Sequence, residues 1–150
     1  MTPLSRTKPR VFIDADVLFA GSASGSEYGA SLVILRMAEI TLIEALTSEQ
    51  VMTEVERNLS QKIPQALPNF YYLGSRCLQV VPDPEKEVLA LHSSRADAKD
   101  LPILIAAQRE NCPWLVSFNI RHFQPGLSGV TVLRPGDFLS RIRDQLTRLT

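Results

Sequence analysis

The sequence predicts an α/β fold, a three-layer α/β/α sandwich in which helices cover both faces of a central, mainly parallel sheet. Short apolar runs that suit strands alternate with stretches that suit helices along the whole chain. The strand candidates are continuous apolar runs, the pattern of strands buried on both faces of a parallel sheet. A length of 150 residues suits one domain with its own core. We therefore expect a flexible leader over 1–9 and a single domain over 10–150.

The first strand is expected at residues 11–13, where a β-branched and aromatic run ends at Asp14. Residues 21–29 (GSASGSEYG) are rich in Gly and Ser and predict a loop. Residues 31–39 have apolar positions at helical spacing and predict a helix. The run at 40–46 (ITLIEAL) predicts the second strand.

A helix is expected after this strand. Thr47 and Gln50 stand three apart, as in a capping box, and predict its start. Val51, Val55 and Leu59 recur at helical spacing and would form its buried face.

The middle of the chain continues the alternation of helices and strands. Pro64 and Pro68 interrupt the helical pattern. The sequence then predicts a helix at 69–78, a strand at 78–81, and a further helical stretch, EKEVLALHS, opened by Asp83-Pro84. We assign no purpose to this last stretch.

The last third predicts two more helices and two more strands. Asp100 suits an N-cap and Pro102 a first turn, so a helix should begin there. Strands are expected at 114–116, after Pro113, and at 130–133. The apolar side of the C-terminal helix is expected to hold Phe138, Leu139, Ile142 and Leu146.

Charge and composition narrow the function classes. The formal net charge is +0, so there is no global electrostatic attraction for nucleic acid. Any such contact must come from local clusters, such as Arg6, Lys8 and Arg10 or Arg121 and His122, and clusters of this kind are more often solvated surface.

The N-terminal residues carry no signal peptide pattern, and no apolar run is long enough for a membrane span. Cys77 and Cys112 lack the spacing of a zinc site or a disulfide framework, which favours reduced, structural thiols. We expect a cytoplasmic protein without membrane attachment.

Four oxygen-bearing side chains stand where a parallel sheet would gather them. Asp14 and Asn119 follow predicted strands, Asp100 opens a helix, and Glu54 lies in the helix after the second strand. Ligand sites in such sheets lie beyond the carboxyl ends of the strands. Carboxylates crowded in a cleft need a proton or a cation, and an all-oxygen set suits Mg²⁺ or Mn²⁺. The pattern indicates metal-assisted phosphodiester hydrolysis.

Each of these residues also has a plainer explanation. Capping or turn formation would account for Asp100, Asp16, Asp97, Asn119 and Ser117, and surface exposure for Glu54. Asp14 has few such explanations, because it directly follows a buried strand. The pair Asp14 and Asp16 also resembles the haloacid dehalogenase type of phosphatase, but Leu18 stands where that family has Thr.

Four segments in order resemble the PIN-domain nucleases, especially VapC-like toxins of bacterial toxin–antitoxin pairs. They are Asp14-Ala15-Asp16-Val17-Leu18, the stretch from Ser48 to Glu54, the stretch from Asp97 to Leu104, and the stretch from Leu115 to Phe123. The resemblance runs over about residues 10–140. It implies a PIN-like sandwich that is often dimeric and a Mg²⁺- or Mn²⁺-dependent ribonuclease, with RNA as substrate and an antitoxin protein as candidate partner.

Carried over by position, the resemblance implies metal-binding roles for Asp14, Glu54, Asp100 and Asn119. Ser117 would order water or a ligand, and Asp97 would be an accessory acid. The hypothesis is a metal-dependent endoribonuclease.

The chain departs from the family pattern at two positions, because the family usually has Asn at the position of Asp16 and often Asp at that of Asn119. A neutral amide weakens binding of a second ion, and an inward-turned Asp16 would restore the charge. The alternative is a catalytically impaired PIN fold that binds RNA or a protein partner.

Overall fold

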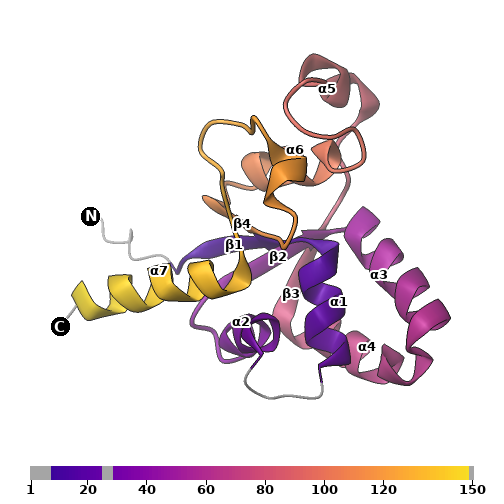
Figure 1. Cartoon of the computed structure of the whole chain (residues 1–150), viewed down its shortest axis with the longest axis vertical. Helices are drawn as coiled ribbons and strands as arrows, with labels where there is room; N and C mark the ends of the chain where they lie inside the picture. The colour runs from indigo at the N-terminus through magenta and orange to yellow at the C-terminus, as the bar shows by residue number, and fades with distance from the viewer. Residues whose placement is uncertain (1–7, 25–28, 149–150) are drawn as a thin grey trace.

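The strands form one parallel sheet between two layers of helices (Figure 1). The computed structural model describes residues 8–24 and 29–148, apart from the side chain of Leu146. Within these residues five strands lie in the order β3-β2-β1-β4-β5, and every neighbouring pair is parallel. The strands are β1 Arg10–Ile13, β2 Glu44–Ser48, β3 Leu78–Val81, β4 Trp114–Val116 and β5 Thr131–Leu133.

β1 occupies the centre of the sheet. Its residues Val11, Phe12 and Ile13 are fully buried, as expected for a strand covered on both faces. Phe12 pairs with Leu46 of β2 on one side and with Leu115 of β4 on the other. Because of this register β1 and β4 end together, and the functional side chains that follow them meet at one edge.

Helices cover both faces of the sheet, which confirms the predicted sandwich. α5 and α6 lie on one face, and α1 to α4 with α7 lie on the other (Figure 1). The α-helices are α1 Ala15–Ala23, α2 Ala30–Glu39, α3 Glu49–Lys62, α4 Leu67–Cys77, α5 Lys86–Leu91, α6 Leu101–Arg109 and α7 Pro135–Arg148; the short 3-10 helices are η2 Pro64–Ala66 and η3 Ile120–Phe123.

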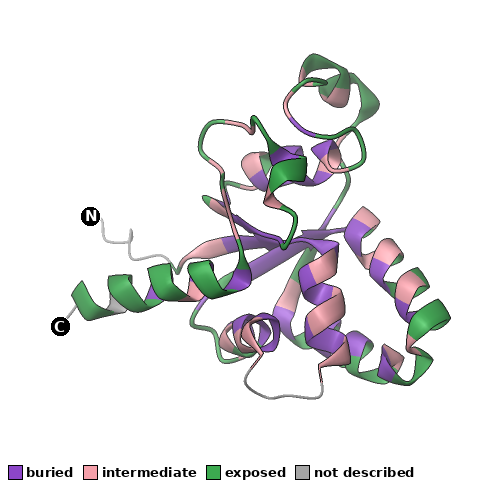
Figure 2. Ribbon diagram, viewed as in Figure 1, coloured by how far each residue is buried: buried purple, intermediate pink, exposed green. Residues whose placement is uncertain are grey.

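Buried residues gather on the sheet and on the helix faces turned toward it (Figure 2). The α3 face is the predicted one, since Val51, Val55 and Leu59 are all fully buried. Phe138 of α7 packs edge-on against Trp114 of β4, with 5.6 Å between ring centroids. α5, which forms within the predicted stretch EKEVLALHS, buries none of its residues.

The loop predicted at 21–29 is wrong at its start, because α1 continues to Ala23. A Cβ at position 21 would lie 2.6 Å from Leu35 Cδ1 of α2. Gly21 therefore permits close helix packing, and its presence does not indicate a turn. Residues 25–28 of the predicted loop lie outside the described residues.

The second strand begins later than predicted. Residues 40–43 form the C-cap of α2 and the turn that follows it, where Thr41 has a φ of 66° and redirects the chain. The predicted cap is shifted by one residue, since Ser48 Oγ accepts a hydrogen bond from Val51 N at 3.3 Å. Thr47 instead lies within β2, and its hydroxyl donates to Ile13 O at 2.8 Å.

The ends of the chain are described from residue 8 to residue 148. Residues 1–7 of the predicted leader lie outside the described residues, whereas Pro9 O accepts a hydrogen bond from Glu44 N at 2.9 Å. Cys77 and Cys112 are free and buried, as expected. Among the described helices, none combines the length and the apolar character needed to span a bilayer.

Candidate active site

Asp14 is the most buried acid of the site. It follows β1 at the N-cap of α1, and it is 5% exposed. Its Oδ1 accepts a hydrogen bond from Ala15 N, and its Oδ2 accepts one from Ser117 Oγ, both at 2.7 Å. Ser117 Oγ also accepts a hydrogen bond from Asn119 N at 2.9 Å. Ser117 thereby links the end of β4 to the end of β1.

Asp16 turns its carboxylate toward the segment after β4. Its Oδ2 accepts hydrogen bonds from Asn119 Nδ2 at 2.9 Å and from Phe118 N at 3.1 Å. Its Oδ1 is buried and has no hydrogen-bond partner. We call this contact the Asp16–Asn119 pair.

A cavity of about 230 Å³ opens beside these residues, and we call it the acidic pocket. Its walls come from four segments far apart in sequence: the N-cap and first turn of α1, helix α3, the residues just before α6, and the segment after β4. The lining residues are Asp14, Ala15, Asp16, Glu54, Asp97, Lys99, Asp100, Asn119 and His122.

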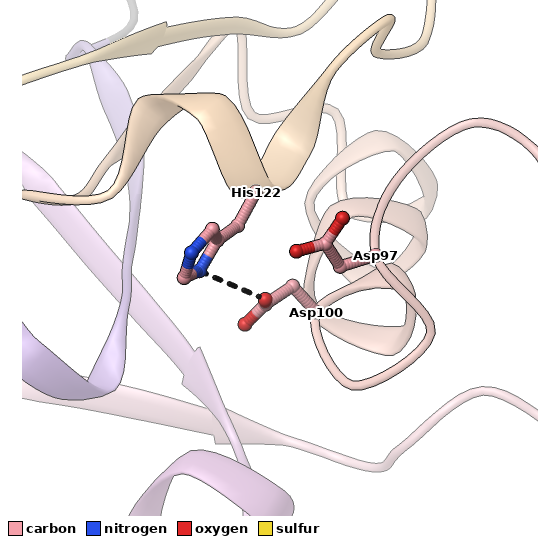
Figure 3. Close-up of side chains that lie close together, drawn as sticks. All are labelled: Asp97, Asp100 and His122. Atoms are coloured by element: carbon pink, nitrogen blue, oxygen red, sulfur yellow. Dashed lines mark ion pairs between the residues drawn. The ribbon is translucent and has the colours of Figure 1, made fainter.

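Two basic groups lie among the acids. Lys99 Nζ is 3.8 Å from Glu54 Oε2, and His122 Nδ1 is 3.4 Å from Asp100 Oδ2. Figure 3 shows His122, Asp97 and Asp100 turned toward a common point. Each of these three residues offers a potential metal-ligating atom, and the three atoms lie within 4.8 Å of one another.

The acids perturb one another because they are withdrawn from water. Burial raises the pKa of Asp14 to about 7, the charges of Asp16 and Asp100 add to this, and the hydrogen bonds from Ser117 and Ala15 oppose it. The pKa of Asp16 is also raised, mainly by burial. Burial likewise raises the pKa of Asp100 against the opposing charges of His122 and Lys99. A bound cation would relieve this cost.

The residues of the acidic pocket fit a divalent cation. Carboxylate and amide oxygens predominate, which suits hard ions such as Mg²⁺ or Mn²⁺. The buried Asp16 Oδ1, which has no hydrogen-bond donor, is the atom that such an ion would satisfy. Among the described residues, Asp100 lies with Asp97 and His122 in a group whose ligand atoms are within 4.8 Å of one another. Asp14, Asp16 and Glu54 line the same cavity and are the further carboxylates that could hold the ion.

The structure brings together the residues that the sequence predicted for the site. Six of the seven line the acidic pocket, and Ser117 lies directly behind Asp14. Asp100 occupies the N-cap position of α6, as predicted, but its side chain makes no capping hydrogen bond. Glu54 is not a solvated surface residue, since its side chain is only 19% exposed.

Sequence reasoning missed the roles of His122 and Lys99 as walls of the pocket. His122 stands three residues after Asn119, and the short helix η3 brings both to the same cavity. The other basic cluster has a structural explanation in part. Arg10 pairs with Glu44 at 2.6 Å and donates two hydrogen bonds to Glu110 O, and Arg6 lies outside the described residues.

A family model for the PIN domain matches residues 10–121, about three quarters of the chain, which includes the ends of β1 and β4 and the acids between them. The chain belongs to the PIN-domain family. The match ends before β5 and α7, which complete the sheet and its cover in this PIN domain. No curated protein matches the sequence significantly.

Two solved structures share the fold of this PIN domain. One is VapBC2 from Rickettsia felis bound to a DNA fragment from their promoter, with a TM-score of 0.63 and 17% identity over 83% of this chain and 98% of that chain. The other is PAE2754 from Pyrobaculum aerophilum, with a TM-score of 0.64 and 16% identity over 91% of this chain and 96% of that chain.

Proposed function

We propose that this PIN domain is a Mg²⁺- or Mn²⁺-dependent endoribonuclease that hydrolyses RNA phosphodiester bonds. The observation that carries the proposal is the acidic pocket, in which five carboxylates from distant segments line one cavity of a PIN domain. Lys99 and His122 also line this cavity, but two basic groups are fewer than the five carboxylates. Such a cluster suits an ion that then meets the negative charge of a phosphate.

The residues divide the work of the site. A bound divalent ion would polarise the phosphodiester and activate water for attack. Asp14, Asp16, Glu54 and Asp100 would hold the ion, and Asp97 would be an accessory acid at the rim. Ser117 keeps Asp14 in place through its hydrogen bond, and Asn119 does the same for Asp16.

The alternative is a PIN fold that has lost turnover and works by binding RNA or a protein. Asn119, where the family often has an acid, favours this alternative. The inward carboxylate of Asp16 supports retained activity, because it supplies next to Asn119 the charge that the amide lacks. We therefore prefer the nuclease, acting in the cytoplasm on RNA.

Substitution of Asp14 tests the proposal. We expect Asp14→Asn to lower Mg²⁺-dependent cleavage of a mixed RNA pool by roughly 100-fold or more, because it removes a charge from the pocket. Asp144→Asn, at an exposed acid of α7, is the matched control and should cleave like the parent. Equal cleavage by Asp14→Asn and the parent would falsify the nuclease.

The toxin role and the homodimer extend the proposal. They rest on the resemblance to VapC-like toxins and on the fold shared with a VapBC2 chain. If the role is correct, a small reading frame beside this gene encodes a protein that binds this chain and suppresses RNA cleavage. Light scattering of the purified chain should give the mass of a dimer. If this chain cleaves RNA equally well when the protein encoded by that neighbouring reading frame is added, the toxin role is contradicted.

A further inference from the structure

A second cavity, of about 490 Å³, adjoins the acidic pocket. The two share Asp97, Asn119 and His122 as walls, so a ligand in one lies beside a ligand in the other. The volume lies within the range of about 300–1,000 Å³ that is usual for small-ligand sites. Phe118 and two arginines form part of the remaining wall, and we call this cavity the arginine pocket.

The wall residues come from the ends of β4 and β5. Ser117 N donates a hydrogen bond to Leu133 O at 3.0 Å, so Phe118 and Arg134 leave adjacent strands at the same edge. The segment after β4 is held against the opposite wall, because Asp97 N donates to His122 O at 2.8 Å. The arginine pocket is thus formed by backbone that the sheet itself positions.

The arginines carry charge that the protein does not neutralise. Among the described residues, neither Arg121 nor Arg134 has a side-chain hydrogen bond or ion pair, and both are exposed. The whole chain has a formal net charge of +0, so this local pair of guanidinium groups supplies an attraction that the molecule lacks overall. Guanidinium groups bind phosphate through paired N–H donors.

Phe118 adds an aromatic surface to the same wall. It is 44% exposed, which is unusual for a phenylalanine in a folded domain. Its backbone N–H donates to Asp16 Oδ2 at 3.1 Å, so the residue is tied to the acidic pocket. An exposed ring next to cations is the combination that binds single-stranded nucleic acid, where unpaired bases stack on aromatic side chains.

We propose that the arginine pocket binds a nucleotide of a single-stranded nucleic acid, next to the phosphate held at the acidic pocket. Phe118 stacks on the base, and Arg121 and Arg134 contact the phosphates. This inference rests on the proposed nuclease function, because the arginine pocket adjoins the acidic pocket, where the phosphate to be cleaved would bind. Selection of single strands follows, since a duplex keeps its base faces stacked on each other.

Binding is measured without cleavage, in EDTA and about 50 mM salt, by the fluorescence anisotropy of labelled eight-nucleotide single-stranded RNA and DNA and of the matching RNA duplex. We expect Phe118→Ala to weaken single-strand binding by about 5- to 100-fold, with little effect on the duplex. Phe118→Tyr keeps the ring and should retain the affinity. Tyr71→Ala, at another exposed aromatic, is the control.

The arginines are tested by the salt dependence of the same binding. Arg134→Ala should reduce the slope of log K against log salt by about 0.7, the value for one phosphate contact on a single strand. Arg134→Lys should restore most of the slope. Arg143→Ala, at an exposed arginine of α7, should leave the slope unchanged.

Three results would overturn the inference. In the first, the parent and Phe118→Ala bind the single strand equally well. In the second, Phe118→Ala weakens binding of the single strand and of the duplex by the same factor. In the third, the parent shows no binding at concentrations up to roughly 1 mM, which is weaker than usual non-specific affinity. RNA and DNA that bind alike support the inference, which places recognition in the base and the phosphate. Binding that depends on the ribose is a fourth result that would overturn it. Because no metal is present, a parent that binds but fails to cleave in Mg²⁺ contradicts only the nuclease.

Discussion

Asp16 and Asn119 form a carboxylate–amide pair in which the two residue types are exchanged relative to the usual pattern of the resemblance. The pair holds one negative charge, on Asp16, and one hydrogen bond, in which Asn119 Nδ2 donates to Asp16 Oδ2 at 2.9 Å. The exchange therefore has a local physical compensation, which explains how the pocket keeps its charge with an amide at position 119.

The exchange can be tested by reversal. Asp16→Asn should weaken Mn²⁺ binding by roughly 10-fold, because the pocket loses a charge. Adding Asn119→Asp to this variant should restore binding, since the charge returns from the other strand end. Calorimetric titration with Mn²⁺ measures both. A double variant that binds as weakly as the single one would show that the two positions are not equivalent.

Asp14 makes the stability of the metal-free protein depend on pH. Its pKa in the folded state is raised to about 7 from the ordinary 3.8, so folding favours the protonated form. The stability from this group is fully present below about pH 4 and is lost as the pH rises through 7.

We compare the free energy of unfolding of the parent and of Asp14→Asn, both in EDTA. As the pH rises from 5.5 to 8, the parent should lose roughly 1–3 kcal/mol more than the variant does. Urea unfolding at the two pH values gives the comparison. The asparagine variant cannot titrate at this position, and it therefore corrects for all other groups. Parallel pH profiles of the two proteins would contradict the burial of an acidic Asp14.

At the scale of elements, two helices end in the same hydrogen-bond pattern with different residues. After α2, Leu42 N donates to Met37 O at 2.9 Å, and Thr41 has a φ of 66°. After α6, Cys112 N donates to Ala107 O at 2.9 Å, and Asn111 has a φ of 58°. This ending favours Gly and tolerates Asn, whereas a β-branched residue is strained there.

Thr41→Gly should therefore stabilise the domain by about 1 kcal/mol, because it removes left-handed strain from a branched side chain. For a chain of this size the melting temperature would rise by about 2–4 °C. Asn111→Gly is the matched control and should change stability much less. A loss of stability in Thr41→Gly would mean that the threonine contacts outweigh the strain.

At the scale of the whole molecule, the acidic pocket depends on the complete fold. The residues proposed to hold the ion come from the N-cap and first turn of α1, from α3 and from the N-cap of α6, and only the closed sheet brings them together. An ion that binds this arrangement binds the folded state and not the unfolded chain. Binding must then stabilise the whole domain.

Mg²⁺ at 100 times its dissociation constant should stabilise the parent by about 2.7 kcal/mol, which is a rise in melting temperature of about 5–10 °C. Scanning calorimetry over a Mg²⁺ series measures this shift. KCl at equal ionic strength controls for screening, and Asp14→Asn should respond much less. An unchanged melting temperature in the parent would contradict a metal site at the acidic pocket.

The sandwich and most of its elements could be predicted from the sequence. Continuous apolar runs such as Val11 to Ile13 predict buried parallel strands. A strand covered by helices on both faces buries every side chain, so its residues do not alternate between apolar and polar. The face of α3 followed from spacing alone, since 3.6 residues per turn places Val51, Val55 and Leu59 together. The same rules predicted that Asp14, Glu54, Asp100 and Asn119 would lie together, and all four line the acidic pocket, whereas their role as metal ligands stays a prediction.

The tertiary structure decided what local patterns leave undetermined. Gly21 lies in α1, where the missing Cβ leaves room for Leu35 of α2, and β2 begins late because Thr41 turns the chain. The orientation of Asp16, the approach of Lys99 and His122, and the arginine pocket all depend on which strand ends become neighbours. Such contacts join residues far apart in sequence, and periodicity reports only on residues a few positions apart.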